Sequence, residues 1–80
     1  MAAVPAEWLQ APVSVAEIDA ELGSSRLREA WQKLKSEMRP GDRILRFESS
    51  AASWEDLAGR AGIALVRDGE AIDAIVTLMN

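Results

Sequence analysis

The side chains that most often perform acid–base and metal chemistry are missing from this chain of 80 residues, which contains no histidine, cysteine or tyrosine. It therefore lacks an imidazole base, a thiolate nucleophile and the usual zinc or copper ligands. Any catalysis would have to use carboxylates, lysines or hydroxyl groups. The composition argues against an enzyme, and we predict no catalytic residue and no cofactor.

Two groups of carboxylates are the remaining candidates for chemistry. Glu55 and Asp56 are adjacent in a predicted helix, where neighbours do not face one another and where the first turn favours acids without any function. Asp68, Glu70 and Asp73 resemble part of a calcium loop, but the full spacing and its closing glutamate are missing. We predict no metal site. The enzyme hypothesis would regain support from a deep pocket lined by Glu48 or Asp73 together with Arg46 or Arg67.

Charge is distributed unevenly along the chain. Residues 1–25, 26–46 and 47–80 have net charges of −4, +4 and −4. The basic middle block places several cations on or just after a predicted amphipathic helix. Such a surface can bind an acidic protein or the phosphates of a nucleic acid.

Tryptophan supplies the other candidate contacts. Trp31 belongs to a helical apolar stripe and is predicted to be core, and Trp54 is expected to pack on the sheet. Trp8 lies in a proline-flanked segment without periodic support, so it is either an anchor for a partner or docked on its own domain. The candidate partner-binding residues are Trp8, Arg28, Lys33, Lys35 and Arg39.

Three functions are compatible with these residues. The leading hypothesis is a small intracellular protein-interaction or regulatory module that binds an acidic protein partner. The alternative is a nucleic-acid-binding protein that uses the basic helix 26–38, although the net charge of −4 opposes it. A further alternative is a phage-type inhibitor whose acidic surface imitates a nucleic-acid backbone, which requires one continuous negative face.

Two helices are predicted in the N-terminal half. Ser14 followed by Glu17 is a capping-box pattern, and the apolar residues after it recur at helical spacing, which predicts a helix over 15–22. A second helix is predicted over 26–38. Its apolar stripe consists of Leu27, Ala30, Trp31, Leu34 and Met38.

Three strands and one short helix are predicted in the C-terminal half. The strands cover 43–48, 63–67 and 71–79, and Ser53 with Asp56 predicts a capped helix over 54–61. Asp68-Gly69 favours a type I′ turn between the last two strands. The resulting register places Arg67 opposite Glu70, Leu65 opposite Ile72 and Ile63 opposite Ala74.

Strand 71–79 determines the predicted sheet order. It is apolar on both faces from Ile75 to Met79, so it should lie centrally or pair across a subunit boundary. We favour the centre, with the order 63–67, 71–79, 43–48 and helix 54–61 as a crossover. The fold class is α+β, with two N-terminal helices packed on a three-stranded antiparallel sheet in the order α-α-β-α-β-β. Both a monomer and a homodimer are compatible with it.

The chain length supports one hydrophobic core. Residues 1–13, rich in alanine and proline, are expected to form an N-terminal tail, and residues 14–80 a single domain. The N-terminal stretch has neither a secretory signal nor a membrane span, and there is no cysteine for disulfides. We therefore expect a cytoplasmic protein without membrane contact.

Four runs from Gly41 onward carry a resemblance to other sequences. They are residues 41–47 (GDRILRF), 53–62 (SWEDLAGRAG), 64–69 (ALVRDG) and 75–80 (IVTLMN). This half of the chain resembles short uncharacterised bacterial proteins of unknown function. The resemblance implies a bacterial or phage-related intracellular protein and implies no activity, so it assigns no functional residue.

Overall fold

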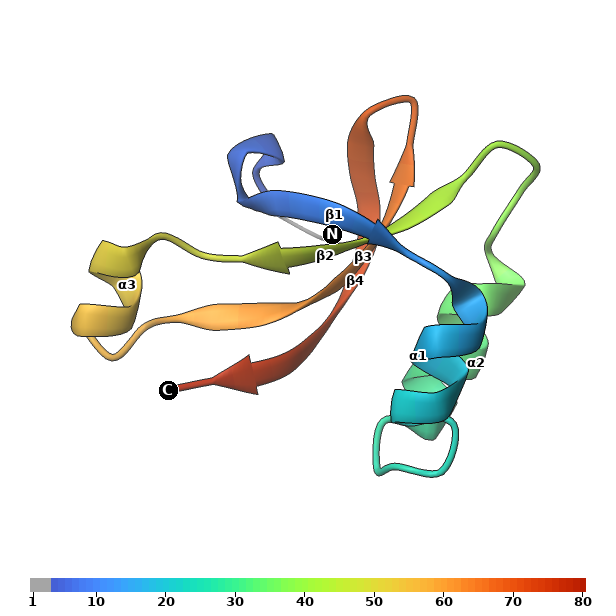
Figure 1. The fold of residues 1–80 in the computed structure, drawn as a ribbon, viewed down its shortest axis with the longest axis horizontal. Coiled ribbons are helices and arrows are strands. Elements are labelled where there is room, and N and C mark those ends of the chain that lie inside the picture. The colour runs from blue at the N-terminus through green and yellow to red at the C-terminus, as the bar shows by residue number, and fades with distance from the viewer. Residues whose placement is uncertain (1–3) are drawn as a thin grey trace.

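A computed structural model describes residues 4–80 as one sheet with helices on one side and at one end (Figure 1). In chain order the elements are η1 (Ala6–Trp8), β1 (Leu9–Val13), α1 (Val15–Leu22), α2 (Arg28–Ser36), β2 (Arg43–Glu48), α3 (Ala51–Glu55), β3 (Arg60–Arg67) and β4 (Glu70–Met79). The α+β class is therefore confirmed. None of the helices in residues 4–80 is both long and apolar enough to cross a membrane.

The sheet has four antiparallel strands, so the prediction of three is wrong. The additional strand, β1, lies within the N-terminal segment that the sequence assigned to a tail. Its residues Leu9 and Val13 pair with Phe47 and Ile44 of β2. Pro12 cannot donate a backbone hydrogen bond, which is tolerated here because β1 is an edge strand.

The strand order also differs from the prediction. The order is β1-β2-β3-β4, so β3 is internal and β4 lies at the edge rather than at the centre. The five consecutive residues 62–66 of β3 are all buried, which requires cover on both faces. The expected crossover helix is the short α3, which connects the neighbouring strands β2 and β3. Adjacent pairing of sequential strands is the commoner arrangement.

The helices agree with the sequence patterns to different extents. Helix α1 has the predicted bounds, and the capping box between Ser14 and Glu17 is present. Helix α2 begins two residues later than predicted and ends two residues earlier. At its start, Ser25 stabilises a preceding turn by accepting a hydrogen bond from the backbone N–H of Leu27. Helix α3 is capped by Ser50, not Ser53, and the end of the predicted helix belongs to β3.

The hydrophobic side chains form two layers, one on each face of the sheet. On the helix side, α1 and α2 pack on the sheet through residues that include Ile18, Leu22, Trp31, Leu34, Ile44, Ile63, Leu65 and Ile75. On the other side, Phe47, Ala64 and Val66 are covered partly by Trp8 and Leu9. Alternation of side chains along β2 and β3 produces this division. Trp31 is fully buried, as predicted.

The hairpin turn is confirmed, but the register beyond it is not. Asp68 and Gly69 both have positive φ, at 54° and 81°, as a type I′ turn requires. Arg67 pairs with Glu70 as predicted. A β-bulge then shifts the register, because β4 contains one more residue than β3 at this point. As a result, Leu65 lies opposite Asp73 and not Ile72, and Ile63 lies opposite Ile75 and not Ala74.

A second register shift on β4 occurs where Gly62 faces it. A Cβ atom at Gly62 would overlap the backbone carbonyl of Ile75, so the strands approach more closely here than a side chain permits. Because Gly62 is buried in β3, the clash cannot be relieved toward solvent.

We expect Gly62→Ala to lower the free energy of unfolding by about 3 kcal/mol, as overpacking of a rigid core does. Gly41→Ala is the matched control: Gly41 has φ of 93° but no atom within 4 Å of its added Cβ, so only backbone strain of about 1 kcal/mol is expected. Urea denaturation of both variants measures the difference. Equal losses would contradict the close approach at Gly62.

Candidate functional site

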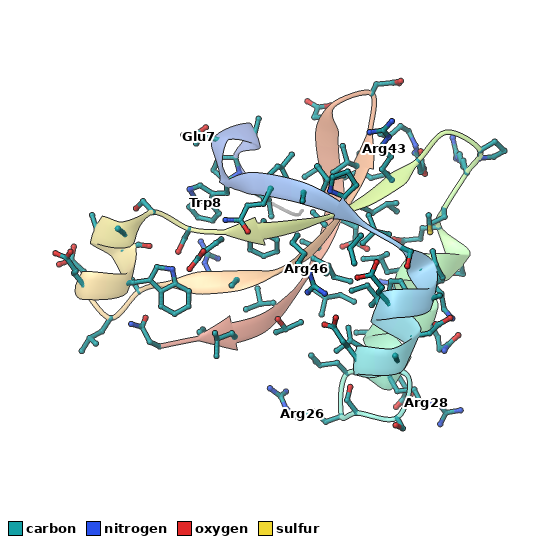
Figure 2. The ribbon with its side chains drawn as sticks, viewed as in Figure 1. Glu7, Trp8, Arg26, Arg28, Arg43 and Arg46 are labelled. Carbon is teal, nitrogen blue, oxygen red and sulfur yellow. The ribbon has the colours of Figure 1, made fainter. Side chains whose placement is uncertain are left out.

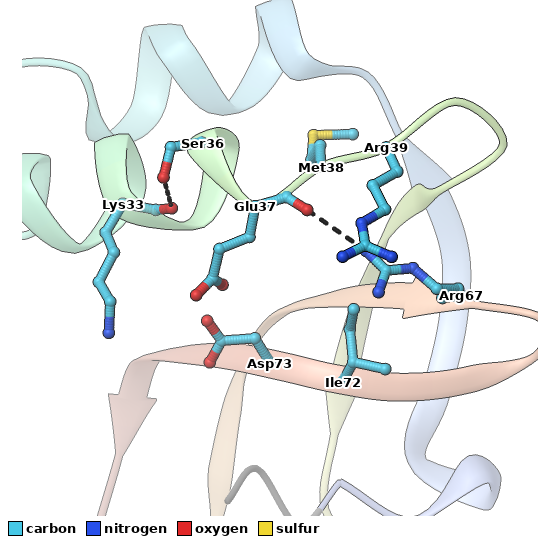
Figure 3. Close-up of a pocket in the computed structure, with 8 residues that line it drawn as sticks. All are labelled: Lys33, Ser36, Glu37, Met38, Arg39, Arg67, Ile72 and Asp73. Carbon is cyan, nitrogen blue, oxygen red and sulfur yellow. Dashed lines mark hydrogen bonds between the residues drawn. The ribbon is translucent and has the colours of Figure 1, made fainter.

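A groove of about 580 Å³ separates the C-terminal end of α2 from the first half of β4 (Figure 3). We call it the α2–β4 groove. Its lining residues are Lys33, Ser36, Glu37, Met38, Arg39, Arg67, Ile72 and Asp73. Most of them are exposed, so the groove is an open surface feature. It joins two segments that are distant in the sequence, residues 33–39 and the hairpin residues 67–73.

The β-bulge at Ile72 builds one wall of the groove. Two consecutive strand residues ordinarily point to opposite faces. Here both Ile72 and Asp73 line the groove, and both side chains extend toward α2 (Figure 3). Ile72 remains 37% exposed, so it offers an apolar contact beside a carboxylate. Bulges commonly redirect side chains in this way.

Glu37 and Asp73 face each other across the groove (Figure 3). The pKa of Glu37 is raised, first by its hydrogen bond with Asp73, then by partial desolvation and by repulsion from that carboxylate. Lys33 and Arg67 act in the opposite direction and limit the effect. Two carboxylates this close cannot both ionise freely, so the pair holds a proton more tightly than an isolated glutamate does.

Arg67 fixes one end of the groove. Its guanidinium donates to both carboxylate oxygens of Asp42, from Nε at 2.9 Å and from Nη2 at 2.8 Å. Nη2 also donates to the backbone carbonyl of Glu37 at 3.3 Å. The Asp42 side chain is only 2% exposed. This bidentate pair therefore ties the end of β3 to the loop before β2 and to the residue that follows α2.

The guanidinium of Arg67 and the backbone N–H of Arg39 together lower the pKa of Asp42 to about 2. Asp42 is therefore ionised throughout the physiological range, and Arg67 remains charged beside it. The Asp42–Arg67 pair is therefore a structural element. It does not involve Lys33 or Arg39, the other cations of the groove.

Lys33 and Arg39 are those available cations. Both side chains belong to exposed residues that line the groove, and neither takes part in a salt bridge in the part of the chain that the structure describes. An exposed cation without a carboxylate partner keeps its capacity for charge-assisted hydrogen bonds. Of the five candidate partner-binding residues, the structure brings these two together.

The other three candidates lie elsewhere. Lys35 forms a salt bridge of 2.8 Å with Asp19. Arg28 is exposed at the start of α2, and Trp8 is far from it on the sheet face opposite the helices (Figure 2).

Trp8 docks on its own domain. Its ring stacks on Phe47 with 6.5 Å between centroids, and the guanidinium of Arg60 lies 5.5 Å from its centroid. Of the two alternatives for Trp8, docking on its own domain describes the structure. Its indole covers part of the apolar layer on the sheet face opposite the helices.

Sequence reasoning did not include Glu37, Ile72 and Asp73 among the binding residues. From the sequence, Asp73 is a candidate only for a calcium-loop fragment and, together with Arg67, for a deep enzymatic pocket. The two do line one groove, but that groove is open and the guanidinium of Arg67 is held by Asp42. The Asp-Gly turn signalled the hairpin, whereas nothing in the residue pattern signalled the bulge that moves Asp73 to the helix side.

The groove can bind a polar ligand of mixed charge. Lys33 and Arg39 can donate to anionic groups, while the Glu37–Asp73 pair accepts hydrogen bonds or a cation from the ligand. The Glu37–Asp73 carboxyl pair could also transfer a proton. A metal site has no support here, because residues 4–80 contain no cluster of three or more side chains suited to a metal ion.

Comparison with known proteins found no matching family model, no matching curated protein and no matching solved structure.

Removal of the Asp42 carboxylate tests the stabilising effect of the Asp42–Arg67 pair. Because the folded-state pKa of Asp42 is depressed to about 2, its stabilising effect is present above the pKa of the unfolded chain and is lost as the pH falls toward 2. We expect Asp42→Asn to lower the melting temperature at pH 7 and to have a shrinking effect between pH 4 and pH 2. Asp56→Asn, at an exposed position away from Arg67, is the control with the same charge change and should leave the melting temperature close to that of the wild type.

Removal of the Glu37 charge should stabilise the protein at pH 7, whereas removal of the Asp42 charge destabilises it. The folded-state pKa of Glu37 is raised, so the favourable contribution of its protonated form is lost as the pH rises through that pKa. We expect Glu37→Gln to raise the melting temperature at pH 7 and to have little effect in acid, where the wild-type side chain is already neutral. Glu29→Gln, an exposed position in the first turn of α2, is the control with the same charge change. A uniform shift at all pH values would show that repulsion from Asp73 is not the cause.

Proposed function

We propose that the protein is a small protein-interaction module that binds an acidic segment of a protein partner in the α2–β4 groove. One observation carries the proposal: two exposed cations without salt bridges, Lys33 and Arg39, lie in the same groove as the exposed apolar side chain of Ile72. Charged anchors beside an apolar contact are typical of protein interfaces.

The carboxylates of the groove favour a polypeptide over a nucleic acid. A nucleic-acid backbone presents only negative charge, which Glu37 and Asp73 would repel. A polypeptide can place its own carboxylates near Lys33 and Arg39 and donate backbone or side-chain hydrogen bonds to the Glu37–Asp73 pair. The mixed charge of the groove therefore supports a partner that contains both donors and acceptors.

The rigidity of the groove also supports binding. Arg67 is held by two hydrogen bonds to a nearly buried carboxylate and by a third contact to the end of α2. The helix end and the hairpin are thus kept at a constant separation before a partner arrives. Such preorganisation lowers the entropy that binding would otherwise cost.

Nucleic-acid binding through helix α2 remains the alternative. Arg28 and Lys33 are exposed on it, which is the observation in its favour. It has less support than a protein partner, because Lys35 is engaged by Asp19 and the groove beside Lys33 contains two carboxylates.

The further alternative, an acidic surface that imitates a nucleic-acid backbone, has the least support. Three acids form salt bridges with bases from other parts of the chain: Asp19 with Lys35, Glu21 with Arg46 and Asp42 with Arg67. Each pair interrupts the negative charge that such a surface would need.

The proposal is tested with a synthetic peptide as probe. We expect a ten-residue peptide that alternates glutamate with leucine or valine to bind at low salt and to shift the amide NMR signals of residues 33–39, 67 and 72–73. The double variant Lys33→Glu/Arg39→Glu should weaken binding at least about tenfold, because each lost charge-assisted contact is worth about 1.4 kcal/mol or more. Arg28→Glu, at the exposed start of α2 and outside the groove, is the control for charge reversal and should bind like the wild type.

Two results would contradict the proposal. One is a set of shifted signals that lies away from the groove, for example around Trp8. The other is tighter binding of duplex DNA than of the peptide, with an affinity that falls steeply as salt is added and is lost in Arg28→Glu. That second result would favour the nucleic-acid alternative.

A further inference from the structure

Helix α3 is followed by a leucine in a backbone conformation that favours glycine. The backbone N–H of Leu57 donates to the carbonyl of Trp54 at 3.2 Å, and that of Ala58 donates to the carbonyl of Ser53 at 2.8 Å. These two hydrogen bonds form a Schellman motif, which places one residue after the helix in the left-handed conformation. Leu57 is that residue, with φ of 59°. Leucine is strained in this conformation because its Cβ crowds the backbone, whereas glycine is not.

The strain at Leu57 is not offset by packing within its own domain. Leu57 is 75% exposed, so most of its apolar surface stays in contact with water. Asp68, the other non-glycine residue with positive φ in residues 4–80, is explained by the hairpin turn that it forms. Strained residues that the fold itself does not require cluster at binding sites. Leu57 therefore opposes folding and is available to a partner.

Two more apolar side chains are exposed at the same end of the sheet. Leu78 and Met79, at the end of β4, are 60% and 68% exposed. The side-chain amide of Asn80 ties this strand end to α3, because it donates at 2.7 Å to the same carbonyl of Trp54 that accepts from Leu57. Leu57, Leu78 and Met79 are three of the four large hydrophobic residues that are exposed in residues 4–80. We call these three the α3-end patch.

The charges beside the α3-end patch are negative. Glu55 and Asp56 directly precede Leu57, both are exposed, and neither forms a salt bridge in the part of the chain that the structure describes. The nearest base in the sequence, Arg60, lies over the ring of Trp8. Apolar side chains bordered by such carboxylates are complementary to a segment that carries both apolar and basic residues. The same carboxylates repel nucleic acids and anionic lipid surfaces.

We propose that the α3-end patch binds a basic segment of a protein partner that also contains apolar residues. Leu57 is the apolar anchor, and Glu55 and Asp56 pair with lysine or arginine side chains of that segment. Helix α3 lies at one end of the molecule and α2 at the other (Figure 1). The α3-end patch and the α2–β4 groove therefore select segments of opposite charge, and this proposal does not depend on the proposed function.

The probe is a ten-residue peptide that alternates lysine with leucine, the basic counterpart of the peptide for the α2–β4 groove. We expect it to shift the amide NMR signals of residues 51–59 and 78–80. A peptide with serine in place of every leucine is the control for simple attraction to the net charge of −4. It should bind at least about tenfold more weakly, because it lacks the apolar contact.

Leu57→Gly separates the effect on binding from the effect on folding. Removal of the backbone strain should raise the melting temperature by about 3 °C, whereas loss of the anchor should weaken binding of the lysine–leucine peptide about tenfold. A leucine that packs within its own domain would give a lower melting temperature instead. Ile72→Ala removes the other exposed apolar side chain, which lies in the α2–β4 groove, and should leave this binding unchanged.

A charge reversal tests the acidic border of the patch. Glu55→Lys should weaken binding of the lysine–leucine peptide several-fold at low salt, and the difference should shrink at about 1 M salt, where charges are screened. Glu29→Lys is the matched control, because Glu29 is also an exposed helical glutamate but lies on α2. It should bind like the wild type.

Four results would overturn the proposal. They are the absence of shifts at residues 51–59 and 78–80, equal binding of the serine peptide, full binding by Leu57→Gly, and self-association of the wild type that Leu57→Gly abolishes. The last result, measured by sedimentation equilibrium, would assign the patch to a second copy of the chain. Failure of the acidic peptide to bind the α2–β4 groove would leave all four unaffected, so the two proposals fail separately.

Discussion

The burial of β3 on both faces is the constraint on which the rest of the fold depends. Residues 62–66 are buried without interruption, and the small residues Gly62 and Ala64 allow close approach to neighbouring strands. A strand of this kind needs a neighbour on each edge and a layer on each face. Strands β2 and β4 supply the neighbours, α1 and α2 supply one layer, and the Trp8 segment covers part of the other.

The position of β3 has a direct consequence for β4. Once β3 is internal and β2 occupies its other side, the hairpin leaves β4 at the edge of the sheet. The strand with the most apolar C-terminal half is therefore also the strand with a free backbone edge. The bulges in β4 shift its pairing with β3, once beside Gly62 and once near the turn. They also determine which side chains of β4 point toward the helices.

Electrostatic pairs connect the acidic and basic blocks of the chain. Helix α1 contributes Asp19 and Glu21 to pairs with Lys35 and Arg46, and Asp42 holds Arg67. The first two pairs are largely exposed and contribute little to stability. The third is nearly buried on its acidic side and joins three segments around the α2–β4 groove. Two cations of the basic block, Lys35 and Arg46, are thus paired with acids of α1, and the others form no salt bridge within residues 4–80.

Local patterns in the sequence were sufficient for much of the secondary structure. The capping box at Ser14, the apolar stripe that contains Trp31 and the Asp68-Gly69 turn each depend on interactions between residues close in the chain. Helix α1, the core position of Trp31 and the closing pair Arg67–Glu70 followed from them. The α+β class followed as well.

Features that depend on long-range contacts were decided only by the tertiary structure. A one-residue bulge leaves no mark in a pattern of period two, yet it moves Asp73 from solvent to the groove. Strand β1 has little β pattern of its own, and it becomes a strand because β2 offers it an edge and Phe47 offers Trp8 a stacking surface. By itself, the sequence determined which segments are helical or extended and which faces are apolar. The packing of β3 decided strand order, register and the assembly of the groove, because those depend on contacts between residues far apart in the chain.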